Sequence, residues 1–151
     1  MRTITLIIIH CSATRCNCRY TFGQCRRDHI SHNGWKDIGY HYYVETDGSV
    51  HRGRAEAVAG AHCRNHNAHS IGICYEGGLD ASGHAADTRT AAQRRALLAL
   101  VADLHRRYPR AIVLGHRDLS PDLDGNGLIT PNEYIKQCPC FDAIKEYGDN
   151  L

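Results

Sequence analysis

The sequence has no long hydrophobic run, no clear excess of charge of one sign, no internal repeat and no low-complexity linker. Its apolar runs fall far short of the roughly 20 residues that a helix needs to cross a membrane, so we expect no membrane span. With 18 basic and 16 acidic residues, the formal net charge of +2 gives no reason to expect nucleic acid as a partner. A chain of 151 residues suits one domain, so we expect residues 1–151 to form a single domain.

The first residues also lack the features of an export signal. A secretory signal needs an apolar core of about 7 to 15 residues, and residues 6–9 are too few. A lipoprotein signal places a small residue before the modified cysteine, whereas His10 precedes Cys11 here. We therefore expect synthesis in the cytoplasm without a signal peptide, where reducing conditions keep most cysteines as thiols or metal ligands.

The order of local patterns predicts an α/β fold. The patterns give a strand, a helix, a β-hairpin, a strand, a helix and a strand, which is typical of a central mixed β-sheet flanked by helices. Thr21 with Gln24, and Thr90 with Gln93, have the spacing of capping boxes at the two helix starts. The expected segments are residues 4–9, 22–32, 40–45 with 49–52, 70–75, 91–108 and 111–114.

Cysteine and histidine are abundant, with 8 and 11 residues, and both ligate zinc. The strands predicted at residues 4–9 and 111–114 are followed closely by His10 and His116, and Cys138 lies in the segment KQCPCF. Three such ligands with a fourth position open to water define a catalytic zinc site. The spacing alone equally allows three ordinary polar residues at a strand edge.

Longer segments resemble a known family. IIIHCSAT, GWKDIGYHYYVETDGSVHRGR, GAHCRNHNAHSIGICYEGG, GHRD and KQCPCF are similar to the zinc N-acetylmuramoyl-L-alanine amidases of the phage T7 lysozyme type, whose fold the peptidoglycan recognition proteins share. The resemblance extends in order from the first strand to about Phe141. It implies a zinc ion on His10, His116 and Cys138, an assisting Tyr40, and a Lys136 that stabilises the transition state.

The reaction that the resemblance implies is hydrolysis of the amide between N-acetylmuramic acid and L-alanine in peptidoglycan. It suggests an endolysin-like enzyme of a phage, prophage or mobile element, which acts on the cell wall and works as a monomer. One alternative is a module that binds muropeptides without cutting them, and another is a regulatory contact with a second protein. Relatives without activity lose the zinc cysteine, so Cys138 favours the enzyme.

Several further polar residues are candidates for substrate contacts, in addition to the implied zinc ligands, Tyr40 and Lys136. In the family, the loop that contains His62, His66, Asn67 and His69 lines the substrate groove, so the resemblance implies substrate contacts for His62, Asn67 and His69. Solvated side chains in a polar loop are the alternative. We expect structural roles for His41 and His51 in the hairpin. For Trp35 we expect a core position, with a place in the groove wall as the alternative.

Residues 122–133, DLDGNGLITPNE, are absent from the short phage form and have the spacing of a calcium loop. The expected ligands are Asp122, Asp124, Asn126, the carbonyl of Leu128 and Glu133, with Thr130 at position 9 and Gly127 at the sharp turn. The preceding HRDLSP does not have a helical pattern, so a full EF-hand is not expected. A plain polar loop is the alternative to a structural calcium site. Thr130 to Glu133 also form a capping box, which predicts a short helix from Pro131 that carries Lys136 toward Cys138.

The remaining cysteines give weaker signals. Cys16 and Cys18 form a CxC pair outside the phage pattern. The alternatives for this pair are two plain thiols, a second metal site and an oxidised pair. We expect Cys11, Cys63 and Cys74 to be small buried residues.

Overall fold

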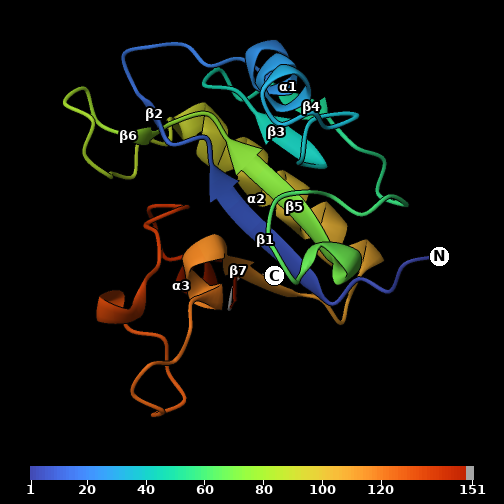
Figure 1. Ribbon diagram of the computed structural model, residues 1–151, viewed down its shortest axis with the longest axis vertical. Helices are drawn as coiled ribbons and strands as arrows, with labels where there is room; N and C mark the ends of the chain where they lie inside the picture. Colours follow the sequence, from blue (N-terminus) through green and yellow to red (C-terminus); the bar gives the residue numbers. More distant parts are fainter. Residues whose placement is uncertain (149–151) are drawn as a thin grey trace.

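Five strands form the central sheet of the computed structural model, which describes residues 1–148 (Figure 1). Across the sheet they lie in the order β4 (Val50–Arg52), β3 (Tyr42–Val44), β5 (Ser70–Tyr75), β1 (Leu6–Cys11) and β7 (Ile112–Gly115). All neighbours are parallel except β4, which is antiparallel to β3. The predicted mixed sheet is therefore confirmed. Residues 149–151 of the predicted domain lie outside the described residues.

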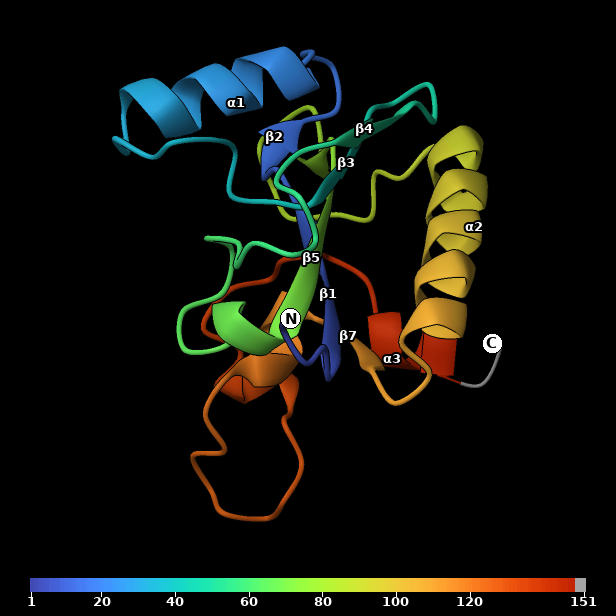
Figure 2. The same ribbon diagram turned by 90° about the vertical axis from the view of Figure 1, so that its right-hand side faces the viewer.

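Helices cover both sides of this sheet, as Figure 2 shows. The helices α2 (Ala91–Arg107) and α3 (Ala143–Gly148) pack on one face, and α1 (Phe22–Ser31) lies on the opposite side near β3 and β4. Two residues each of β2 (Thr14–Arg15) and β6 (Gly78–Leu79) form a separate parallel pair. Short 3-10 turns are η1 (Asn67–His69), η2 (His116–Leu119) and η3 (Pro131–Glu133). Among the described residues, no helix is both long and apolar enough to cross a bilayer.

The capping boxes predicted at the starts of α1 and α2 are both confirmed. The Gln24 side chain accepts a hydrogen bond from the N–H of Thr21 (2.7 Å), whose hydroxyl accepts one from the N–H of Gln24 (3.3 Å). Thr90 and Gln93 make the same pair of bonds at the start of α2, at 2.9 and 3.0 Å. These side chains satisfy N–H groups that have no partner within the helix, which fixes where each helix begins.

The strand β1 has no polar alternation because both of its faces are covered. Ile7, Ile8 and Ile9 are all fully buried. Successive side chains on a strand point to opposite faces, so Ile7 and Ile9 pack with α2 while Ile8 joins Cys63 and Leu114 in a separate cluster. His10 follows Ile8 on this second face, opposite α2.

Three local expectations need correction. The strand β1 continues to Cys11, so His10 lies within it and pairs in register with Cys74. Tyr40 lies before β3 and not within the hairpin strand.

The helix expected to run from Pro131 through Lys136 is also wrong, because η3 ends at Glu133. Tyr134 has an extended conformation, and the N–H of Ile135 bonds to the hydroxyl of Ser120 (3.1 Å) instead of to the preceding turn. The chain is thereby drawn back toward η2, and Lys136 lies in an irregular segment.

Candidate metal centre and groove

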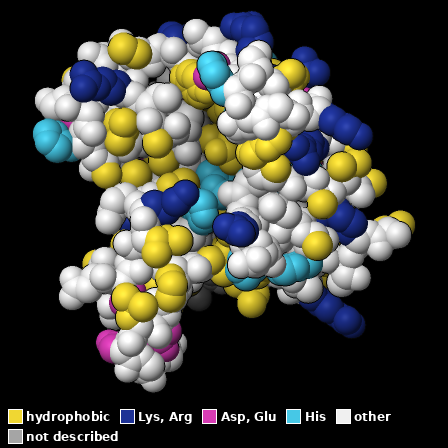
Figure 3. Space-filling model, viewed as in Figure 1, with side chains coloured by type: hydrophobic (Ala, Val, Ile, Leu, Met, Phe, Trp, Pro, Cys, Tyr) yellow, Lys and Arg dark blue, Asp and Glu magenta, His cyan; other side chains and the backbone are white. Residues whose placement is uncertain are grey.

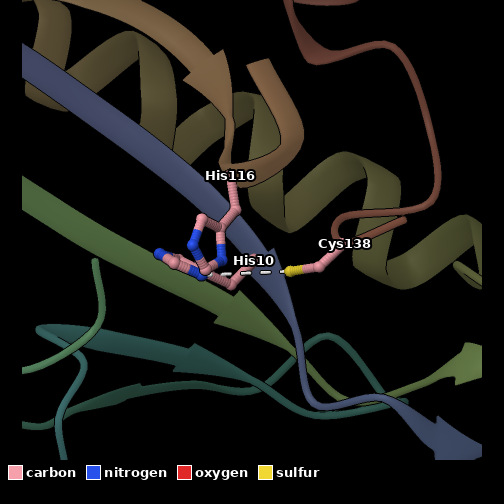
Figure 4. Close-up of side chains that lie close together, drawn as sticks. All are labelled: His10, His116 and Cys138. Atoms are coloured by element: carbon pink, nitrogen blue, oxygen red, sulfur yellow. Dashed lines mark hydrogen bonds between the residues drawn. The ribbon is translucent and has the colours of Figure 1, made fainter. Parts of the chain in front are cut away.

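His10, His116 and Cys138 come together at one end of the parallel sheet (Figure 4). Their ligand atoms all lie within 4.8 Å of one another. Ile9 of β1 pairs with Gly115 of β7, so the two residues that follow, His10 and His116, become neighbours. Their ring centroids are 4.6 Å apart, and the Sγ of Cys138 is 3.9 Å from the Nδ1 of His10.

Two backbone hydrogen bonds place Cys138. The N–H of Arg117, the residue after His116, donates to the carbonyl of Cys138 at 2.9 Å. The N–H of Cys11, the residue after His10, donates to the Sγ of Cys138 at 3.2 Å. Cys138 is thus held at its carbonyl and at its sulfur by the residues that directly follow the two histidines.

The surroundings of the three side chains favour the protonation states that a metal requires. Burial lowers the pKa of His10 well below its ordinary value, and burial followed by the charge of Lys136 lowers that of His116 to about 4. Hydrogen bonding to the Cys11 side chain is the largest cause of a lowered pKa at Cys138. Metal binding needs neutral imidazoles and a thiolate. The donor set therefore fits a tetrahedral zinc ion with one position left open.

The three residues lie at the floor of a groove of about 490 Å³. In Figure 3, histidine side chains occupy the central hollow, and basic side chains lie on both sides of it. Tyr40, Trp35 and Lys136 are among the lining residues. The Tyr40 ring centroid is 5.3 Å from that of His10, and burial raises the pKa of Tyr40 well above its ordinary value. Tyr40 is therefore a protonated phenol beside the metal ligands, whereas Lys136 is exposed.

The loop before β5 contributes Ala61 and His62 to the groove lining. The side chain of His62 also contacts a predicted metal ligand. Its Nδ1 lies 2.9 Å from the Nε2 of His10. The side-chain oxygen of Asn67 accepts hydrogen bonds from the N–H groups of His62 and Cys63, at 2.9 and 3.0 Å. His69 lies outside the lining and contacts His66, with ring nitrogens 3.4 Å apart. The structure thus brings only His62 of the three expected substrate residues to the groove.

Two aromatic rings line the groove, although the sequence analysis favoured the core for one and gave no role to the other. Trp35, expected in the core, is half-buried and lines the groove together with His29 of α1. The Nδ1 of His29 accepts a hydrogen bond from the N–H of Gly39 at 2.9 Å, which anchors the residue before Tyr40. The likeness of the GWKDIGYH segment to the family pattern was the available signal for Trp35, and nothing singled out His29.

The structural roles expected for other residues agree with their contacts. His41 is buried, with Nδ1 accepting from the N–H of Gly72 (3.0 Å) and Nε2 facing the carbonyl of Val58 (2.8 Å). His51 stacks on Phe22.

All eight cysteines are free thiols, and Cys11, Cys63 and Cys74 are buried as expected. Cys16 and Cys18 are exposed, and no group of three metal-binding side chains within residues 1–148 includes them.

The calcium-like loop protrudes from the body of the molecule (Figure 1). Carboxylate oxygens of Asp122, Asp124 and Glu133 lie within 4.8 Å of one another. Glu133 is buried and accepts hydrogen bonds from the N–H groups of residues 123, 124 and 130, and Asp122 accepts from those of residues 125 and 127. The segment before the loop forms η2, a four-residue 3-10 turn and not an EF-hand helix.

The chain is similar to several known proteins. The family model described as N-acetylmuramoyl-L-alanine amidase matches residues 1–139. The endolysin of Escherichia phage T7 is 34% identical over 144 residues, which cover 95% of this chain and 85% of that protein. Peptidoglycan-recognition protein SC2 of Drosophila melanogaster is 34% identical over 113 residues, 73% of this chain and 58% of that protein.

A solved amidase structure has a similar fold. The N-acetylmuramoyl-L-alanine amidase LysC from Clostridium intestinale superposes with a TM-score of 0.72 at 25% identity. The superposition covers 96% of this chain and 82% of that one.

Proposed function

Since this chain belongs to the N-acetylmuramoyl-L-alanine amidase family, we propose that it is a zinc-dependent enzyme that cleaves the amide between N-acetylmuramic acid and L-alanine. The observation that carries the proposal is the meeting of two imidazoles and one thiol within 4.8 Å at the floor of a groove. His10, His116 and Cys138 would hold the zinc ion. We expect a single amidase domain that acts on the cell wall as a monomer.

The chemistry divides between the metal and the residues around it. When bound, zinc supplies positive charge that polarises the amide carbonyl and makes water more acidic. Lys136 places a second positive charge at the groove, where negative charge develops on the carbonyl oxygen as water adds. Tyr40, a protonated phenol beside His10, positions the water and relays a proton toward the leaving amine. The products are a lactyl carboxylate and a stem peptide with a free amino group on L-alanine.

Mass spectrometry of purified peptidoglycan after digestion by the zinc-loaded protein tests this function. We expect stem peptides with a free L-alanine amino group, and their loss in Cys138→Ser. Cys16→Ser is the matched control, because it removes an exposed thiol away from the groove.

The second candidate, a muropeptide-binding module, is supported by the likeness to peptidoglycan-recognition protein SC2. Under this alternative, the protein pulls down peptidoglycan but releases no new amino termini. That result would replace the enzyme by a binding module on the same fold.

We also propose that residues 122–133 bind a structural calcium ion through Asp122, Asp124, Asn126, the Leu128 carbonyl and Glu133. The motif and the three converging carboxylates support this site. Calcium that binds only the folded state raises the thermal midpoint. We expect a rise at millimolar calcium in the wild type and none in Asp124→Asn, and an unchanged wild-type midpoint would refute the site.

A further inference from the structure

His62 is engaged through both of its ring nitrogens. Its Nδ1 lies 2.9 Å from the Nε2 of His10, and its Nε2 lies 3.2 Å from the hydroxyl of Ser70. Ser70 is fully buried. The side chains of His10, His62 and Ser70 therefore form one continuous row of contacts. It begins at His10, a predicted metal ligand, and ends at Ser70 inside the protein. No ring nitrogen of His62 is left over for a sugar or a peptide.

The positions of the hydrogens along this row of side chains follow from the chemistry of His10. The Nδ1 of His10 faces the Sγ of Cys138 at 3.9 Å, so this nitrogen is the one directed at the metal position. A neutral imidazole has one N–H, and the nitrogen that binds metal must be free of hydrogen. The hydrogen of His10 then lies on Nε2 and is donated to the Nδ1 of His62. His62 in turn carries its hydrogen on Nε2 and donates it to Ser70.

The protein is built to hold the His62 ring at this place. A Cβ on Gly72 of β5 would lie 2.5 Å from the Cγ and Cδ2 of His62, and a Cβ on Gly60 would lie 2.6 Å from Cδ2. Glycine at these two positions leaves the space that the ring fills. The Asn67 side chain fixes the loop backbone by accepting a hydrogen bond from the N–H of His62 at 2.9 Å.

We propose that His62 is a positioning residue that fixes the ring orientation and the tautomer of His10, so that Nδ1 of His10 is ready to bind zinc. The inference rests on the proposed metal site and assigns His62 a role other than the substrate contact expected from sequence. Hydrogen-bonding partners of this kind fix the orientation of metal-bound histidines, and their loss typically weakens metal binding or activity about 10- to 100-fold.

Two substitutions of His62 separate the hydrogen bond from simple packing. His62→Leu fills the space with an apolar side chain of similar reach and removes the acceptor. His62→Asn places a side-chain oxygen near the position of Nδ1. His69→Leu is the matched control, because His69 belongs to the same loop and lies outside the groove lining. Zinc affinity is measured by competition with a chromophoric chelator, and the tautomer of His10 in zinc-free protein by ¹H–¹⁵N NMR.

We expect His10 to carry its hydrogen on Nε2 in the wild type. In His62→Leu we expect a mixture of tautomers and zinc binding weakened roughly 10- to 100-fold. His62→Asn should recover most of the zinc affinity, and His69→Leu should match the wild type. If His62→Leu does not fold, Ser70→Ala decides, because it removes only the hydroxyl at the far end of the row and should still shift the His10 tautomer.

The outcomes keep this inference apart from the proposed function. Tight zinc binding and an unchanged His10 tautomer in folded His62→Leu would overturn the positioning role and leave the zinc enzyme intact. If His62→Leu does not fold, tight zinc binding and an unchanged His10 tautomer in Ser70→Ala would overturn the positioning role in the same way. Failure of the wild type itself to bind zinc would instead refute the proposed function.

Discussion

Lys136 is exposed, yet its charge reaches the histidines at the floor of the groove. After burial, it is the second cause of the lowered pKa of His116, and it also lowers that of His10. The same charge is available to a carbonyl oxygen in the groove. A single side chain thus favours the metal-binding form of the ligands and, in the proposed reaction, would stabilise the transition state.

Removing this charge should separate zinc binding from turnover. For Lys136→Met we expect a loss of about 10²- to 10³-fold in kcat, the magnitude seen when one stabilising donor of an oxyanion is removed. Bound zinc should stay at the wild-type level, because Lys136 donates no ligand atom. Turnover assays and zinc analysis of the same samples test this, and wild-type kcat in the variant would exclude a role for Lys136 in the chemical step.

The same substitution should raise the pKa of His116 in zinc-free protein above its value of about 4. A nearby positive charge disfavours the imidazolium form, so its removal makes protonation easier. NMR titration of the histidine ring signals measures this, with Lys145→Met on α3 as the control. An equal His116 pKa in wild type and Lys136→Met would contradict the electrostatic account.

At the scale of elements, Gln93 connects α2 to the sheet as well as capping the helix. Its side-chain nitrogen donates to the carbonyls of Val44 (3.2 Å) and Glu76 (2.9 Å). Gln93 is fully buried, whereas Gln24 performs only the capping function on α1. One residue thus fixes the start of α2 against the ends of β3 and β5.

The two capping glutamines allow a matched comparison. Gln24→Ala should lower the free energy of unfolding by about 1 kcal/mol, as expected for the loss of one hydrogen bond to the N–H of Thr21. Gln93→Ala should lower it by about 3 kcal/mol, because two buried carbonyls also lose a donor. Urea denaturation of both variants measures the difference, and equal losses would show that the bonds of Gln93 to the sheet add nothing.

Elements with a strong local pattern could be predicted from the sequence, and those formed by contacts between distant segments could not. The helix α2 has a capping box and a long apolar repeat, and its predicted start is confirmed. The strands β2 and β6 contain two residues each, too few for any periodicity. Likewise, the chain after Glu133 has a helical start signal that is overridden by its bonds to the Ser120 region.

The residues of the candidate site also divide into those that a local pattern predicts and those that only contacts between distant segments bring together. The strands that deliver His10 and His116 were visible as apolar runs, and their parallel pairing explains why the two histidines meet. Cys138 reaches them through an irregular segment held by Arg117 and Cys11, which no local pattern encodes. The sequence could name this cysteine as a candidate, and the resemblance to the family set it apart from the other cysteines. The contact of His62 with His10 depends on Gly60 and Gly72. The close approach of these glycines to the His62 ring becomes visible only in the fold.

At the scale of the whole molecule, Glu56 joins three distant parts of the chain. Its carboxylate accepts hydrogen bonds from Tyr42 of β3, from Arg107 of α2 (2.7 and 2.9 Å) and from Tyr108 (2.6 Å). Its carbonyl accepts two further bonds from the guanidinium of Arg2. The hydrogen bonds from Arg107 are the largest cause of a Glu56 pKa lowered from 4.5 to about 2.

This lowered pKa predicts how stability depends on pH. The contribution of Glu56 is complete above pH 4.5 and is lost as the pH falls toward 2, because protonation then becomes favourable in the folded state. Glu56→Gln should therefore lower the free energy of unfolding at pH 7 by roughly 1 to 2 kcal/mol, with a smaller difference near pH 2.

Urea denaturation across this pH range tests the prediction. Asp103→Asn is the control, since Asp103 pairs with the same Arg107 but is half-exposed. A difference between wild type and Glu56→Gln that stays constant down to pH 2 would show that the Glu56 charge is not what stabilises the fold.

The central claim is that His10, His116 and Cys138 hold a single zinc ion on which cleavage depends. Its most direct test is to measure bound zinc and stem-peptide release together, in wild type and in His10→Ala, His116→Ala and Cys138→Ser, as zinc is added back to chelator-treated protein. We predict that release in the wild type rises in step with bound zinc and reaches its maximum at one ion per chain, and that each variant loses both. Full release by zinc-free protein, or a ligand variant that keeps both zinc and activity, would contradict the account.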